Sequence, residues 1–167
     1  DATGICGAAA AATVAATMMG LDGEQIKNAA SLALSLCGGL NQYSIDGGSP
    51  KYLCAGWAAK LGIVSAKLSK SGMKGPEFIF EGRLGYVNAF ASKPNKDFLL
   101  LAEARWEVRN VYLKRYACVR RIHPTLDVVE ELRRQHGIAE GDIDDIRVFG
   151  GRFVCEAAVY RPDDVVK

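Results

Sequence analysis

A glycine-rich turn in the first half of the chain holds the side chain best suited to bind an anion. The turn reads DGGSPK, begins at Asp46 and ends at Lys51. Because proline keeps the residue before it out of the helical region, the next helix begins no earlier than Pro50. A lysine beside the free N–H groups of a helix start favours a carboxylate or a phosphate. The alternative is a solvated lysine in a common type of loop, with Asp46 as a turn former rather than a partner of Lys51.

Two side chains in the second half of the chain are suited to proton transfer and carboxylate binding. His123 comes just before a predicted helix, and the unperturbed pKa of histidine lies near neutrality, as a general acid or base requires. Its alternative role is a helix-entry residue that bonds a free N–H. Arg120 is a candidate for bidentate carboxylate binding, although most arginines simply lie at the surface.

Composition excludes several classes of protein. The net charge of the 167-residue chain is only +2, and the charges are interspersed, which gives no footprint for nucleic acid. The five cysteines are widely spaced and form no CxxC, so we expect no disulfide framework, no metal site and a cytoplasmic location. Residues 2–21 carry no charge, but they are rich in alanine and lack a basic leader. They predict a buried helix rather than a membrane span or signal peptide.

Helical patterns dominate the first 105 residues. Helices are expected over residues 5–19 and from a capping box at Asp22 and Gln25 to residue 37. The small side chains of the first helix should let its neighbours approach closely. After the DGGSPK turn, an apolar stripe at helical spacing predicts the buried face of a third long helix. The stripe consists of Trp57, Leu61, Val64 and Leu68.

The pattern changes near Trp106. Residues 108–116 favour extended chain, residues 124–136 a well-capped helix that Gly137 ends, and residues 143–149 a strand. The predicted fold is therefore mainly α, with part of a helical domain over residues 1–105. The start of a smaller α+β domain is expected over residues 106–167.

A series of short motifs resembles one family over nearly the whole chain, and in the same order. They are MMGLD (18–22), SLCGGL (35–40), DGGSPK (46–51), GWAA (56–59), GIVSA (62–66), GMKGP (72–76), EGRLGY (81–86), KRY (114–116), CVRRIH (118–123) and DDI (144–146). The sequence is similar to the MmgE/PrpD family, which includes 2-methylcitrate dehydratase, cis-aconitate decarboxylase and iminodisuccinate epimerase. The chain departs from the family at Asp1 and Cys54, where members often have histidine.

The resemblance implies a function and a site. Family members bind small di- or tricarboxylates between a helical and an α+β domain, without a metal or organic cofactor, and are often homodimers. Lys51 matches the lysine of the family's DGxxxK turn and would hold a substrate carboxylate, with Asp46 and Arg120 as further substrate-binding residues. His123 matches the histidine of CxRxxH and would transfer a proton.

The resemblance also implies that the chain is an internal fragment of a longer lyase or isomerase, and among the possible reactions it favours dehydration. Two alternatives from other classes stay open. One is a non-catalytic polycarboxylate-binding or structural remnant of the family. The other is a helical interaction module without a ligand.

Overall fold

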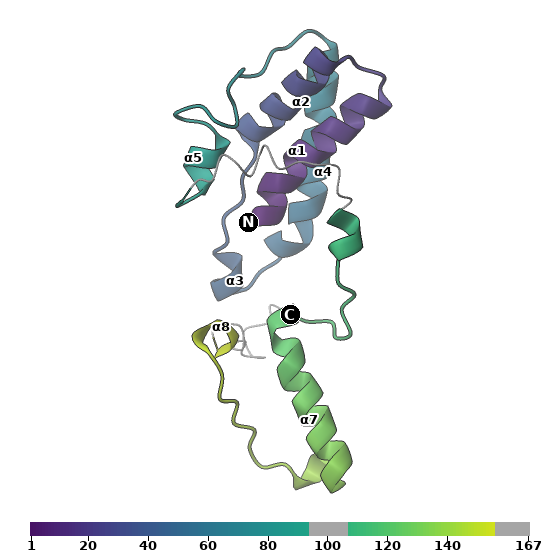
Figure 1. The fold of residues 1–167 in the computed structure, drawn as a ribbon, viewed down its shortest axis with the longest axis vertical. Coiled ribbons are helices and arrows are strands. Elements are labelled where there is room, and N and C mark those ends of the chain that lie inside the picture. Colours follow the sequence, from purple (N-terminus) through teal and green to yellow (C-terminus); the bar gives the residue numbers. More distant parts are fainter. Residues whose placement is uncertain (94–106, 156–167) are drawn as a thin grey trace. The chain divides into compact units, whose positions relative to one another are not determined.

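The structure is a computed structural model that describes residues 1–93 and 107–155. It divides into two compact units, one within Asp1–Glu103 and the other within Ala104–Val165 (Figure 1). The described residues form helices and no strands, which confirms a mainly α fold. Among these residues, none of the helices has the length and hydropathy that crossing a membrane requires.

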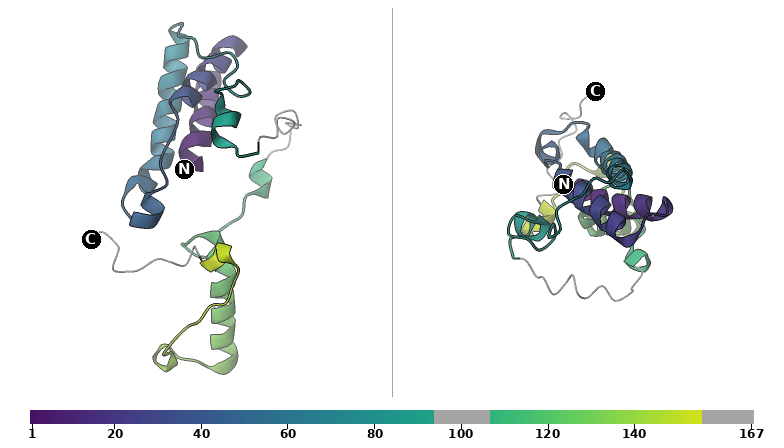
Figure 2. Two further views of the ribbon diagram at one scale, coloured as in Figure 1. Left: turned by 90° about the vertical axis from the view of Figure 1, so that its left-hand side faces the viewer. Right: turned by 90° about the horizontal axis from the view of Figure 1, so that it is seen from above.

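The first unit is built on three long helices that pack against one another. They are α1 (Ala2–Met18), α2 (Gly23–Leu36) and α4 (Pro50–Lys70). Each contacts the other two, and they lie side by side in all views (Figures 1 and 2). Two short helices, α3 (Tyr43–Asp46) and α5 (Tyr86–Phe90), belong to the loops around this bundle.

The core of the bundle consists almost entirely of small side chains. Its fully buried members recur at helical spacing along all three helices: Ala8, Ala12 and Ala16 on α1, Ala29 and Ala33 on α2, and Ala58 and Ala66 on α4. A Cβ atom added to Gly62 of α4 would lie 2.5 Å from the Cβ of Ala11 on α1. The prediction that small side chains bring the helices close together is therefore confirmed.

The predicted apolar stripe of α4 is wrong in its position. Trp57 is 64% exposed and Val64 is 42% exposed, while Leu61 and Leu68 lie half-buried at the border. The buried face contains smaller residues instead: Ala58, Gly62, Ser65, Ala66 and Ser69. Helix backbones that approach this closely leave no room between them for an indole or a branched side chain, so hydrophobicity alone selected the wrong face.

The beginning of α2 is as the sequence predicted. Asp22 accepts a hydrogen bond from the backbone N–H of Gln25 at 2.8 Å, and the Gln25 side chain accepts one from the N–H of Asp22 at 3.2 Å. This reciprocal capping box satisfies two of the donors that a helix start leaves unpaired. It fixes where α2 begins after the turn that follows α1.

The described part of the second unit contains one long helix, α7 (His123–His136), which confirms the helix predicted there. Gly137 ends it in the left-handed conformation, at φ 63°. Short helices precede and follow it: η1 (Glu107–Asn110), η2 (Arg120–Ile122), η3 (Glu140–Asp142) and α8 (Arg152–Cys155).

The two predicted extended segments of the second unit do not form strands. Residues 108–116 begin inside η1 and continue irregularly, and residues 143–149 pair with no other described segment. A strand depends on ladder hydrogen bonds to a neighbour, so sequence alternation alone does not create one. The α+β domain over residues 106–167 therefore stays a prediction, and its expected first residue, Trp106, lies outside the described residues.

Candidate functional site

Helix α4 begins at Pro50, as the sequence predicted, and Lys51 is its second residue. Ser49 nevertheless has helical backbone angles (φ −88°, ψ −11°), so the expectation that the proline keeps this residue out of the helical region is wrong. Its side chain is exposed, and its Nζ atom lies 5.8 Å from the centre of the Tyr43 ring. Among the side chains that the structure describes, Lys51 makes no ion pair. Its ammonium group is thus available to an anionic ligand at the start of a helix.

The turn before Lys51 depends on two glycines. Asp46 is the last residue of α3, and Gly47 and Gly48 follow with φ angles of 81° and 109°. Residues with a side chain rarely adopt such positive φ angles, so the glycine pair is what allows the chain to reverse between α3 and α4. The backbone thereby places Asp46 and Lys51 on either side of one tight turn.

Tyr43 joins Lys51 to the beginning of α1. Its hydroxyl group donates a hydrogen bond to Oδ2 of Asp1 at 2.9 Å, while Oδ1 of Asp1 accepts one from the N–H of Thr3 at 3.1 Å. Burial, and after it the neighbouring Cys54 thiol, raise the pKa of Tyr43, which favours the neutral phenol as a hydrogen-bond donor. Sequence reasoning missed Tyr43 because only the fold brings its ring to Lys51.

His123 is the first residue of α7, and its imidazole is in contact with Tyr116. The two ring centres are 5.1 Å apart and the rings are nearly perpendicular, at 87°. The Nε2 atom of His123 is buried, and no described residue forms a hydrogen bond with it. Buried ring nitrogens normally have a partner, so this atom is a candidate for proton transfer to a ligand.

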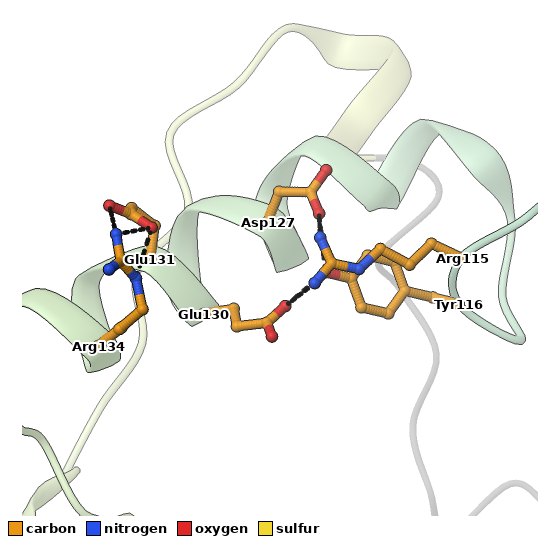
Figure 3. A network of polar contacts seen from close by, with 6 residues as sticks. All are labelled: Arg115, Tyr116, Asp127, Glu130, Glu131 and Arg134. Carbon is orange, nitrogen blue, oxygen red and sulfur yellow. Dashed lines mark hydrogen bonds and ion pairs between the residues drawn. The ribbon is translucent and has the colours of Figure 1, made fainter.

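Tyr116 is held by two carboxylates of α7 (Figure 3). Its hydroxyl lies 2.8 Å from Oδ1 of Asp127 and 2.9 Å from Oε2 of Glu130. The guanidinium group of Arg115 bonds the same two oxygens, at 3.1 Å and 2.9 Å. The hydrogen bond to Asp127, then burial and the bond to Glu130, raise the pKa of Tyr116 far above its ordinary value.

Arg120 is the first residue of the short helix η2, which ends directly before His123. Its guanidinium carbon is 3.5 Å from the centre of the Tyr112 ring, which is close stacking. In the described part of the chain it forms no ion pair with a carboxylate. Its planar group is therefore held by an aromatic face while its N–H donors remain available to an anion.

The sequence model of the MmgE/PrpD N-terminal domain matches residues 2–99. The chain belongs to the MmgE/PrpD family. It is also similar to the cis-aconitate decarboxylase-like protein oryM of Aspergillus oryzae (strain ATCC 42149 / RIB 40), with 26% identity over 141 residues. The match covers 79% of this chain but only 29% of that protein, so the chain spans less than a third of this relative. No solved structure matches.

The predicted site residues of this MmgE/PrpD chain fall into two groups. Asp46 and Lys51 belong to the first unit and lie within the matched N-terminal domain, whereas Arg120 and His123 belong to the second unit. Within each unit the two residues are near each other in the sequence, close to the start of a helix. A single site containing Lys51 and His123 stays a prediction. In the described residues no set of three or more His, Cys, Asp or Glu is placed to hold a metal ion.

Proposed function

We propose that this MmgE/PrpD chain supplies part of the active site of a lyase or isomerase. The enzyme would act on a small di- or tricarboxylate by removing a proton from the carbon beside a carboxylate, without a cofactor. The observation that carries the proposal is the buried Nε2 atom of His123, which has no partner among the described residues. In a protein of this family, such an atom is suited to exchange a proton with carbon.

Lys51 would bind a carboxylate of the substrate. Removal of the neighbouring proton gives an enolate-like species, whose negative charge spreads onto the carboxylate oxygens. An ammonium group beside the carboxylate, together with the start of α4, stabilises the negative charge that develops in the transition state more strongly than it stabilises the bound substrate. Asp46 and Arg120 would orient the other carboxylate and hydroxyl groups.

His123 would take the proton and return it. The C–H bond breaks, its electron pair stays on carbon, and the proton passes to Nε2. Loss of a β-hydroxyl as water then gives dehydration, the outcome we favour, and reprotonation on the opposite face gives epimerisation. A third outcome is decarboxylation, the reaction in the name of the Aspergillus relative. In that case loss of CO2 leaves a carbanion, which His123 protonates.

A second candidate is a protein that binds a polycarboxylate without turning it over. It is favoured by Asp1 and Cys54, which stand where family members often have histidine. Without these histidines, Lys51 and Arg120 would still bind carboxylates. The two candidates therefore differ in proton exchange rather than in binding.

We further propose a cytoplasmic homodimer. The exposed apolar side chains of α4, among them Leu53 and Trp57, support self-association because large apolar groups on a surface favour a partner. Sedimentation velocity is the direct measurement, and a monomer at all concentrations would contradict the dimer.

Proton exchange in D2O tests the proposed function. The chain, and the longer protein of which we expect it to be a part, would be incubated with 2-methylcitrate, citrate, cis-aconitate and iminodisuccinate. Proton NMR then follows deuterium at the carbon beside the carboxylate, and any product. We expect exchange or turnover with at least one compound. Binding of these compounds without exchange would contradict the enzyme and support the second candidate.

A further inference from the structure

We infer that Tyr116 is a positioning residue for the imidazole of His123, and that α7 itself holds Tyr116 in place. The role in turnover rests on the proposed function. The contact itself does not, because it depends only on the geometry of the second unit.

The ring contact restricts the imidazole. Tyr116 meets His123 in an edge-to-face arrangement, with ring centres 5.1 Å apart. Such pairs favour a defined mutual orientation, so rotation of the imidazole about its side-chain torsions is opposed by the tyrosine ring. Since no described residue bonds Nε2, Tyr116 is the aromatic contact that fixes where this nitrogen points.

The anchor of Tyr116 lies on the same helix as the histidine. Asp127 and Glu130 follow His123 by four and seven residues, so all three side chains share one face of α7. The hydroxyl of Tyr116 lies within hydrogen-bond distance of both carboxylates (Figure 3). The loop before α7 is thus fastened to the helix that begins with His123, and the phenol ring is held against the imidazole.

Arg115 makes this arrangement of charges favourable. Two carboxylates that share one hydroxyl group would repel each other, but the Arg115 guanidinium bonds the same oxygen of each. The pKa of Tyr116 is raised mainly by its bond to Asp127, so the hydroxyl remains a donor throughout the range in which histidines titrate. The anchor therefore persists in both protonation states of a neighbouring imidazole.

NMR of the histidine side chains tests the inference directly. The chain has two histidines, and His136 at the far end of α7 is an internal reference. In the wild-type chain we expect nuclear Overhauser contacts between the ring protons of Tyr116 and His123. Tyr116→Phe keeps the ring but removes its anchor, so these contacts should weaken at least twofold, while the signals of His136 stay unchanged. Contacts of unaltered strength in Tyr116→Phe would overturn the inference.

A matched control is available on the same helix. Glu131 bonds Arg134 at 2.7 Å and does not contact Tyr116, so Glu131→Gln removes an ion pair of α7 without touching the anchor (Figure 3). It should leave the contacts of His123 as they are. Asp127→Asn, which weakens the anchor from the helix side, should act like Tyr116→Phe. Equal effects of Glu131→Gln and Asp127→Asn would overturn the inference, because the anchor would then have no special role.

Kinetics separate positioning from a merely structural role. In the active protein, Tyr116→Phe should lower kcat about tenfold and leave KM within about twofold, because misplacement of a reacting group slows chemistry more than binding. Loss of the ring contact with an unchanged kcat would overturn the positioning role. An inactive wild-type protein would refute the proposed function, but the NMR result would still decide whether Tyr116 holds the imidazole.

Discussion

At the scale of single residues, Tyr86 connects α5 to α1. Its hydroxyl lies 3.2 Å from Sγ of Cys6, and its ring packs against Phe80 and Phe90. Burial, and after it the bond to Cys6, raise the pKa of Tyr86 from 10.0 to about 12. A buried phenolate is poorly solvated, so the folded state favours the neutral phenol of Tyr86.

This shift predicts how stability depends on pH. Because the folded pKa of Tyr86 is above the unfolded one, its contribution is fully present below pH 10 and is lost as the pH rises towards 12. Urea unfolding of the wild type and Tyr86→Phe should show a difference that is constant from pH 7 to 9. Above pH 10 the wild type should lose stability faster. Parallel pH profiles of the two proteins would contradict the assignment.

Residue type and position marked Lys51 and His123 as candidates with a structural alternative each, and the resemblance to the MmgE/PrpD family then gave them their predicted roles. The sequence also marked Asp46 and Arg120, but it gave no sign of Tyr43 or Tyr116. Tyrosine is a common core and surface residue, so its type carries little information. What makes these two tyrosines relevant is their distance from Lys51 and His123, and that distance depends on how loops return to helices.

At the scale of elements, the two helical glycines Gly56 and Gly62 of α4 have opposite surroundings. A Cβ atom at Gly62 would lie 2.5 Å from the Cβ of Ala11 and from the backbone N of Ala12, whereas a Cβ at Gly56 would have no neighbour within 4 Å. The close approach of α1 to α4 therefore depends on Gly62, while Gly56 only adds flexibility to an exposed part of the helix.

Alanine substitution at the two sites should have opposite effects. Gly62→Ala forces the helix backbones apart and should lower the free energy of unfolding by about 1–3 kcal/mol. Gly56→Ala should raise it by about 0.5–1 kcal/mol, because alanine favours the helix interior over glycine. Urea denaturation of both variants checks this pair of predictions. If Gly62→Ala were as stable as Gly56→Ala, the close packing described for the bundle would be wrong.

The elements themselves were largely predictable, and their packing was less so. Local signals gave the capping box at Asp22, the helix start at Pro50 and the stop at Gly137, because each depends on neighbours in sequence. The buried face of α4 was not predictable from hydrophobicity, since Trp57 is exposed where Ala58 is buried. The segments expected as strands, 108–116 and 143–149, failed for a related reason: pairing depends on a neighbouring strand.

At the scale of the whole molecule, family membership explains why the site candidates are divided. The family match ends at residue 99, and Lys51 lies within it while His123 lies beyond it. A single pocket with residues from both units is what the resemblance to the family implied, and it stays a prediction. The change of pattern near Trp106 predicted that Lys51 and His123 belong to different domains, and a kinetic experiment can decide whether they share one site.

A double-mutant cycle on Lys51 and His123 tests whether the two residues act on one substrate in a shared site. With the polycarboxylate that shows turnover, kcat/KM would be measured for Lys51→Ala, His123→Gln and the double variant. The control is Lys60→Ala, on the same helix, whose Nζ atom lies over the ring of Trp57 at 4.9 Å.

We expect each single variant to lower kcat/KM at least about 100-fold. The kcat/KM of the double variant should be only slightly lower than that of the less active single variant, because the effects of residues that act together on one substrate are not additive. Lys60→Ala should match the wild type. An unchanged kcat/KM in either single variant, or effects that multiply in full, would contradict a shared site.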